Sequence, residues 1–128
     1  MGKHKKSSMT FAQKFEDLEI WQESRRLNRI IYASLEDCRD YSFRDQMRRA
    51  ALSVMNNISE GFERRTPKDF AHFLDLAKGS AGEVRSMTYA AEDLKILRND
   101  IAIGFKGVEF RRSVFIVGIV FRESGIDG

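Results

Sequence analysis

The sequence holds few of the residue types that define several protein classes. Its 128 residues include one proline, one cysteine, two histidines and nine glycines. So few prolines and glycines exclude a low-complexity disordered chain and disfavour an all-β domain, which needs a turn about every ten residues. The lone cysteine cannot form an internal disulfide, and no apolar signal-peptide core follows the basic start of the chain. We therefore expect a single cytoplasmic domain of the all-α class, with no membrane segment.

The excess of positive charge is small and unevenly placed. The chain has 22 lysines and arginines against 19 aspartates and glutamates, a net charge of +3. Lys3, Lys5 and Lys6 lie in residues 1–14, which have few apolar residues and are predicted to be a basic, disordered tail. Any basic surface on the folded domain must therefore come from local clusters of charge.

Apolar residues recur at helical spacing in three segments between residues 15 and 98, which predicts three amphipathic helices. The first segment covers residues 15–38, and the second runs from about residue 43 to residue 60. Ser42 and Asp45 resemble a capping box at the start of the second helix. Gly61 is a candidate terminator for the same helix, although Phe62 would still fit its apolar stripe.

The start of the third helix has the clearest signal in the chain. Thr66 is a good N-cap residue, Pro67 suits the first helical position, and Asp69 places an acid in the first turn. The helical period continues without a breaker to about Arg98. This predicts a helix of roughly thirty residues, about 45 Å long.

Two glycines interrupt the middle of this third helix. Gly79 and Gly82 each cost about 1 kcal/mol relative to alanine in a helix. Close approach of another backbone would offset that cost, and the second helix has small residues at Ala50, Ala51 and Ser53. We therefore predict that the second and third helices are neighbours that cross tightly at these positions.

The last segment, residues 99–128, differs from the rest of the chain. It is rich in glycine, and its apolar residues from 114 to 121 show no sharp helical face. The pattern fits a degenerate fourth helix or a buried strand equally well. The apolar run is also too short to span a bilayer, which needs about twenty residues.

Little in the sequence points to catalysis or to a cofactor. His72 follows Asp69 at i+3, but a di-iron bundle site needs two such pairs and two further glutamates. Neither of the common phosphate-binding glycine motifs occurs. We therefore interpret His72 as a surface or partly packed histidine and expect a protein without catalytic residues, metal or cofactor.

Polar residues lie beside the apolar stripes of the second and third helices. Helical spacing lets the two groups face each other, which favours a hydrogen-bonded network that fixes the register of the two helices. A catalytic pair formed by the two glutamates of this set is the weaker alternative, because no base or metal ligand accompanies it. The network is predicted to consist of Ser53, Asn57, Glu60, Ser80 and Glu83.

Arginines cluster on the first two helices and in the turn before the third. Arginine suits bidentate contacts with phosphate or carboxylate groups. The same residues could instead pair with neighbouring acids, in one subunit or between subunits, and the sequence leaves both interpretations open. The candidate nucleic-acid-binding residues are Arg25, Arg29, Arg48, Arg49, Arg64 and Arg65.

Three blocks of the sequence resemble the signature of a known family. They are residues 15–22 (FEDLEIWQ), 46–62 (QMRRAALSVMNNISEGF) and 70–83 (FAHFLDLAKGSAGE). In this order they resemble the four-helix-bundle proteins encoded in intervening sequences of 23S ribosomal RNA genes. The resemblance covers residues 15–97 and implies an up-and-down four-helix bundle that assembles into five-fold rings.

The resemblance also suggests partners. The family is similar to the accessory variability protein of diversity-generating retroelements, a basic pentamer that binds nucleic acid and a reverse transcriptase. By this likeness, the chain is expected to bind itself and RNA or DNA, with a reverse transcriptase or a ribosome-associated protein as a further partner. A structural module that only contacts other proteins is the alternative.

The sequence departs from the family pattern after about Leu97. Relatives continue there with a glycine-poor amphipathic fourth helix, whereas residues 99–128 are glycine-rich and apolar all round. One hypothesis is a change of reading frame in the gene. Translation of the DNA in the other two frames tests it, and finding no family-like helix in either frame would reject it.

Overall fold

The computed structural model describes residues 12–64, 66–96 and 118 of the chain. Within these residues the fold is all-α: it contains the three helices α1 (Glu19–Ser34), α2 (Tyr41–Glu63) and α3 (Pro67–Asp93) and no strand. A short 3-10 turn, η3 (Phe15–Asp17), precedes α1. The all-α class and the three patterned helices are confirmed. Of the tail predicted over residues 1–14 the structure describes only residues 12–14, and of the segment 99–128, predicted as a possible fourth helix, it describes only residue 118, so neither prediction is tested.

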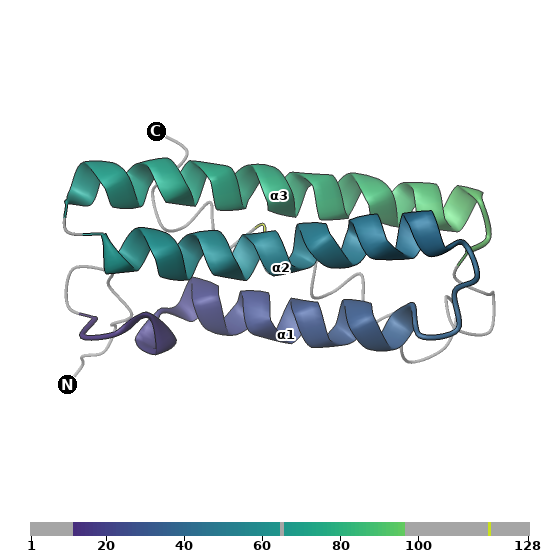
Figure 1. Cartoon of the computed structure of the whole chain (residues 1–128), viewed down its shortest axis with the longest axis horizontal. Helices are drawn as coiled ribbons and strands as arrows, with labels where there is room; N and C mark the ends of the chain where they lie inside the picture. Colours follow the sequence, from purple (N-terminus) through teal and green to yellow (C-terminus); the bar gives the residue numbers. More distant parts are fainter. Residues whose placement is uncertain (1–11, 65, 97–117, 119–128) are drawn as a thin grey trace.

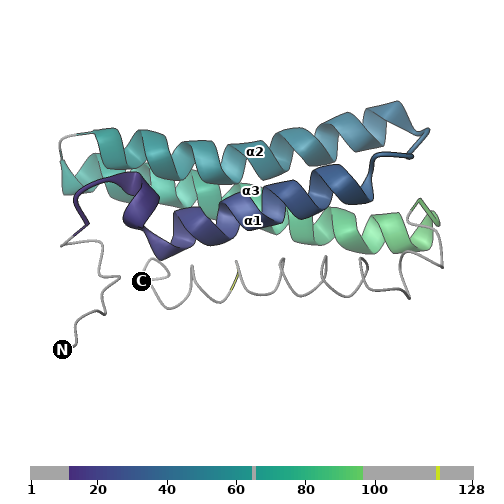
Figure 2. The same ribbon diagram turned by 90° about the horizontal axis from the view of Figure 1, so that it is seen from below.

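The three helices run side by side, each antiparallel to the one before it (Figures 1 and 2). α2 lies between its neighbours and packs against both of them. Their apolar stripes form one core, and burial of each large side chain in it contributes about 1.5–3 kcal/mol. Its fully buried members include Leu27, Ile31, Leu35, Met47, Val54, Ile58 and Val84.

The first predicted helix is broken near its start. Leu18 has extended backbone dihedrals and separates η3 from α1, and its side chain is buried in the core. Gln22 donates from Nε2 to the carbonyl oxygen of Glu16 at 2.9 Å, which holds η3 against the first turn of α1. Ser24 lies within the apolar stripe of α1: it is buried, and its hydroxyl donates to the carbonyl oxygen of Ile20.

The predicted capping box of α2 is wrong by two residues. Asp40 is the N-cap, and its Oδ1 accepts a hydrogen bond from the backbone N–H of Phe43 at 3.1 Å. Ser42 lies exposed inside the first turn instead. Aspartate and serine are about equally good N-caps, so the choice between two candidates so close in sequence depends on how the preceding loop enters the helix.

Gly61 does not terminate α2, which continues to Glu63. The residue is buried, and a Cβ atom built on it would lie 2.6 Å from Cβ of Phe73 and 3.1 Å from a ring carbon of Phe70. Real Cβ contacts are essentially never shorter than 3.0 Å. Gly61 is therefore the position at which α2 and α3 approach too closely for any side chain.

The start of α3 is confirmed, but its end is five residues earlier than predicted. Thr66 Oγ1 accepts from the backbone N–H of Asp69 at 3.1 Å, and Pro67 occupies the first turn. At the other end Lys95 has a φ of 54°, and its N–H donates to the carbonyl oxygen of Glu92. The N–H of Ile96 donates to the carbonyl oxygen of Ala91, which completes a Schellman cap. A lysine at this left-handed position, where glycine is usual, gives no sequence signal for the end of the helix.

The second and third helices are neighbours as predicted, but the close-packing role predicted for Gly79 and Gly82 is wrong. Both glycines are exposed, and a Cβ atom added to either would meet nothing within 4 Å. Small residues do line the contact between α2 and α3, but they are alanines: Ala50, Ala51 and Ala77 are all buried. The cost of the two glycines in helix propensity is therefore not offset by close packing against α2.

Candidate nucleic-acid interface

The outer side of α1 carries three exposed arginines. Cζ of Arg25 lies 5.7 Å from the ring centroid of Trp21, one turn earlier on the same helix. Arg26 makes a long ion pair of 3.8 Å with Glu23. Arg29 lies one turn beyond Arg25, on the same side of α1. Two of the three guanidinium groups, those of Arg25 and Arg29, have no carboxylate partner among the described residues.

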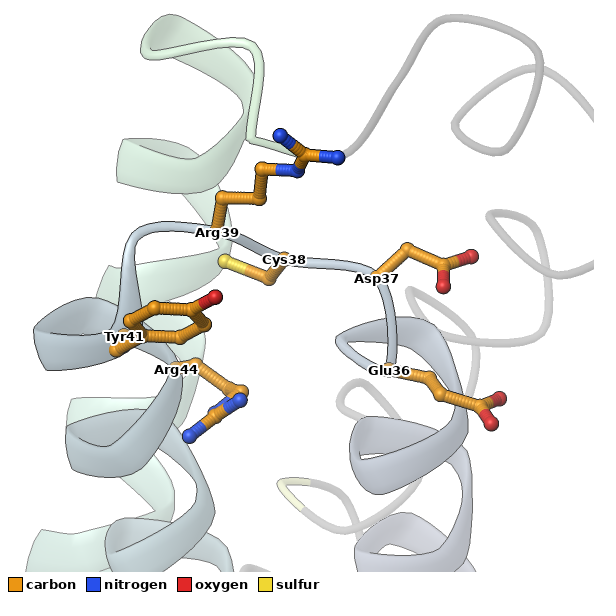
Figure 3. A pocket seen from close by; sticks show the side chains of 6 residues that line it. All are labelled: Glu36, Asp37, Cys38, Arg39, Tyr41 and Arg44. Carbon is orange, nitrogen blue, oxygen red and sulfur yellow. The ribbon is translucent and has the colours of Figure 1, made fainter.

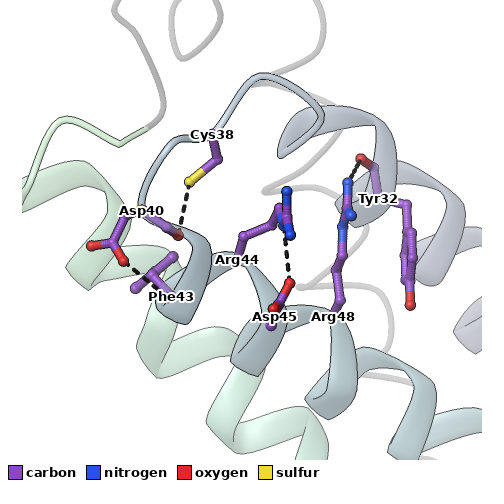
Figure 4. Close-up of polar contacts among 7 residues, drawn as sticks. All are labelled: Tyr32, Cys38, Asp40, Phe43, Arg44, Asp45 and Arg48. Carbon is purple, nitrogen blue, oxygen red and sulfur yellow. Dashed lines mark hydrogen bonds and ion pairs between the residues drawn. The ribbon is translucent and has the colours of Figure 1, made fainter.

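Arg48 joins α2 to α1 (Figure 4). Its Cζ lies 4.5 Å from the ring centroid of Tyr32, and its Nη2 donates to the Tyr32 carbonyl oxygen at 2.9 Å. That carbonyl belongs to the last turn of α1, which has no basic residue of its own. Arg48 thus satisfies an otherwise unpaired helix-end acceptor and opposes the negative end of the α1 dipole. Its Nε is buried without a hydrogen-bond partner.

Arg44 lies one turn before Arg48 on α2 and makes two contacts. Its Nε donates to Oδ1 of Asp45 at 3.0 Å, and its Cζ lies 4.8 Å from the ring centroid of Tyr41. Tyr41 is 60% exposed, so its ring remains accessible to solvent although Arg44 lies over it. Arg44 was not among the candidate site residues predicted from the sequence.

An open hollow of about 610 Å³ lies where α1 ends and α2 begins (Figure 3). Its walls come from the loop between the two helices and from the first turn of α2. They carry two carboxylates, two guanidinium groups, a phenol ring and the thiol of Cys38, which donates to the carbonyl oxygen of Asp40 at 3.4 Å. The lining residues are Glu36, Asp37, Cys38, Arg39, Tyr41 and Arg44.

The arginines of α1 and α2 combine into one surface. Because Arg48 contacts Tyr32, one turn beyond Arg29, the antiparallel register places Arg44, Arg48, Arg29 and Arg25 in succession along the bundle. We call these four residues the α1–α2 basic face. Segments 25–29 and 44–49 together contain six arginines and a single acid, Asp45. This is the local concentration of positive charge that the net charge of +3 does not reveal.

The other candidate arginines lie elsewhere. Arg49 is exposed and lies one turn from Ser53, which contacts α3, so it is on the α2–α3 side of the bundle. Arg64, just after α2, donates from Nη2 to Glu60 at 3.2 Å and lies over the ring of Phe73. Arg65 is outside the described residues. The structure therefore groups Arg25, Arg29 and Arg48 and separates Arg49 and Arg64 from them.

Three members of the predicted polar network are joined by hydrogen bonds. The hydroxyls of Ser53 and Ser80 are 2.8 Å apart and link α2 to α3. Asn57 donates from Nδ2 to both the carbonyl and the hydroxyl oxygen of Ser53, each at 2.9 Å. All three residues are partly buried. The Ser53–Ser80 bond joins the two helices at a fixed register, and the bond from Asn57, which is also on α2, orients the Ser53 hydroxyl.

The two glutamates of the predicted network bond elsewhere. Glu60 pairs with Arg64, and Glu83 accepts from Nε2 of Gln46 at 3.3 Å. The contact with Gln46 places Glu83 about fourteen residues, or about 21 Å along α2, from Glu60. Two carboxylates so far apart cannot act on one reacting group, so the geometry gives the catalytic alternative no support.

The described residues contain no group of three or more histidine, cysteine, aspartate or glutamate side chains able to hold a metal ion. His72 is exposed on α3, with its ring beside that of Phe73.

Among the helices of residues 12–64 and 66–96, none has the length and apolar character needed to cross a membrane.

Antiparallel helices around one core, with four arginines along the side formed by α1 and α2, define a helical-bundle protein with a basic face. The model of the family described as "23S rRNA-intervening sequence protein" matches residues 16–106. The chain belongs to this family. The match continues past Leu97 to residue 106, so residues 107–128 lie beyond it. Comparison with curated proteins gives no match.

Sequence reasoning missed the aromatic partners of the arginines. Two of these contacts could have been predicted from spacing alone. Trp21 precedes Arg25 by four residues and Tyr41 precedes Arg44 by three, and side chains at these spacings lie together on a helix. The contact between Tyr32 and Arg48 could not, because it depends on the register between two helices.

Proposed function

We propose that this protein is a non-enzymatic homo-oligomer that binds nucleic acid, or an enzyme that acts on nucleic acid, through the α1–α2 basic face. The observation that carries the proposal is the succession of four arginines along this face, with Asp45 as the single acid in segments 25–29 and 44–49. Such a surface suits the phosphate backbone, whose contacts dominate the affinity of sequence-tolerant binding.

The aromatic contacts support this role. A guanidinium that stacks on a ring loses side-chain freedom but keeps its N–H donors at the edge of its plane. Arg25 and Arg44 lie over Trp21 and Tyr41 in this manner. Arginine side chains that are already ordered in the free protein lose less conformational entropy when they bind a phosphate. Each such contact therefore contributes more to the free energy of binding.

Assembly into an oligomer would strengthen the electrostatic attraction of this small basic face for nucleic acid. Four arginines on one subunit make a small patch, but repetition around a ring multiplies the field that a polyanion feels. We propose a pentamer on the resemblance to five-fold family rings, with Arg49, Arg64 and Arg65 as secondary phosphate contacts. A reverse transcriptase or ribosome-associated protein would then join the complex through the bound nucleic acid.

A mobility-shift titration with RNA and with duplex DNA at low and at moderate salt tests the proposal. Binding should be tolerant of sequence and should weaken steeply as salt rises. The double variant Arg25→Ala, Arg29→Ala should bind more weakly, and Arg85→Ala on α3 is a matched control because Arg85 is also exposed. Absence of any complex at micromolar protein concentrations would reject a nucleic-acid role.

The second candidate is a module that contacts only protein. Residues 67–93 contain five acids against three bases, and α3 exposes Leu76 and Tyr89. An acidic face on one copy could meet the basic face of another and close a ring. In that case the charge reversal Arg29→Glu, at an exposed residue of the basic face, or Arg48→Glu, which also removes the Tyr32 contact, would change the oligomer mass in solution. Nucleic-acid binding would be absent in the parent protein.

A further inference from the structure

We propose that the α1–α2 basic face takes single-stranded rather than duplex nucleic acid, and that an unpaired base stacks on Tyr41 in the hollow between α1 and α2. The inference rests on the nucleic-acid function proposed above and specifies the form of the ligand. Three features of the structure carry it: the aromatic rings beneath the arginines, the chemistry of the hollow, and the width of the face.

Aromatic rings accompany three of the four arginines of the basic face. Arg25 lies over Trp21, Arg48 over Tyr32 and Arg44 over Tyr41. Phosphate binding alone does not need aromatic rings. A row of cations interleaved with aromatic rings is typical of single-strand sites, where the cations follow the backbone and the rings and guanidinium planes stack with bases.

The hollow at the end of this row suits one nucleotide. Its volume of about 610 Å³ lies within the range of small-molecule sites, about 300–1,000 Å³. Tyr41 is 60% exposed, so its ring offers a stacking surface beside Arg44. Arg39 and Arg44 supply cations for a phosphate, and Glu36 and Asp37 supply acceptors for a base amino group or a sugar hydroxyl.

The width of the basic face disfavours a duplex. Two packed helices, each about 10 Å across with axes 8–10 Å apart, form a surface about 20 Å wide. The major groove of B-DNA is only about 12 Å wide. A duplex could therefore reach the arginines only with its phosphates, and its paired bases could not reach Tyr41. A single strand presents both phosphates and bases to the same surface.

Fluorescence anisotropy at one fixed salt concentration compares an unstructured RNA or DNA strand with a blunt duplex of the same length. The single strand should bind at least about tenfold more tightly. Tyr41→Ala should weaken single-strand binding at least about fivefold, the value of one base–aromatic stack, and should leave duplex binding within twofold. Tyr89→Ala is the matched control, since Tyr89 is 66% exposed on α3.

A strand carrying 2-aminopurine gives a second, independent readout. Stacking on Tyr41 should quench its fluorescence, the quenching should disappear in Tyr41→Ala, and Tyr41→Phe should restore it. Equal affinity for strand and duplex, or unchanged quenching in Tyr41→Ala, would overturn this inference and leave the proposed function standing. Failure of every nucleic acid to bind would overturn both.

Discussion

Arg48 couples α2 to the end of α1 by contacting both the ring and the backbone carbonyl of Tyr32. The guanidinium lies 4.5 Å from the ring centroid and donates to the carbonyl oxygen of the same tyrosine at 2.9 Å. A hydrogen bond to a charged group is worth about 1.5–3 kcal/mol and a cation–π contact about 0.5–2 kcal/mol, but the two are not additive.

Arg48→Ala should therefore lower the free energy of unfolding by about 2 kcal/mol. Arg48→Lys should lose about half as much, because it keeps the charge but not the planar stack. Arg49→Ala is the control and should change stability by less than about 0.5 kcal/mol, because Arg49 is exposed. Urea denaturation followed by circular dichroism measures all three, and equal losses for Arg48→Ala and Arg49→Ala would contradict the contact.

Alanine should have opposite effects at two glycines. Gly61→Ala should destabilise the protein by about 1–3 kcal/mol through overpacking, because the new Cβ would lie 2.6 Å from Cβ of Phe73. Gly79→Ala should stabilise it by about 0.5–1 kcal/mol, since a Cβ there meets nothing within 4 Å. Thermal unfolding of the two variants tests the pair, and a stabilising Gly61→Ala would show that the two helices are further apart.

The N-cap of α2 can be assigned by mutation. Asp40→Ala should cost about 1 kcal/mol of stability, because Asp40 Oδ1 accepts the Phe43 N–H. Ser42→Ala should change stability by less than about 0.5 kcal/mol, because Ser42 is exposed within the first turn. Chemical denaturation of both variants gives the comparison, and a larger loss for Ser42→Ala would restore the capping box predicted from sequence.

The register of α2 against α3 should depend on Ser53 more than on the glutamates nearby. Ser53→Ala should cost about 1–2 kcal/mol, because its hydroxyl bonds to Ser80 and Asn57. Glu60→Gln and Glu83→Gln should each cost less than about 0.5 kcal/mol, since both side chains are exposed. Denaturation curves for the three variants check this order, and a double-mutant cycle of Ser53 with Ser80 should reveal coupling.

Phosphate contacts should appear in the salt dependence of binding. If Arg29 neutralises one phosphate, Arg29→Ala should lower the slope of log affinity against log salt by about 0.7 for a single strand or about 0.9 for a duplex. The loss of affinity should be similar for strands of different sequence. Titrations at several salt concentrations measure the slope, with Arg85→Ala as the control. An unchanged slope would remove Arg29 from the interface.

Features set by one helix at a time could be predicted from sequence. Apolar spacing gave the three helices, and Thr66 with Pro67 gave the start of α3 to the residue. The incorrect predictions share a cause: they concern features that depend on contacts between helices or on loop conformation. Gly61 is needed because Phe73 approaches it from α3, whereas Gly79 has an exposed position that its sequence context does not reveal.

The candidate site shows the same contrast between features that one helix determines and features that depend on contacts between elements. The arginines were visible as a cluster, and helical geometry separates Arg48 from Arg49 because consecutive residues differ by about 100° around the axis. The pairing of Arg48 with Tyr32 required the antiparallel register of α1 and α2. The hollow beside Tyr41 required the path of the loop between the two helices.

Gly79 and Gly82 also affect the motions of α3. Two exposed glycines in consecutive turns weaken the helix in its middle, by about 1 kcal/mol each, rather than at its ends. Ser80 lies between them and hydrogen-bonds to Ser53 on α2. The amide protons of this turn should therefore exchange with solvent faster than those of the flanking turns. The Ser53–Ser80 bond ties this weak turn to α2, so Ser53→Ala should speed exchange there more than in the flanking turns.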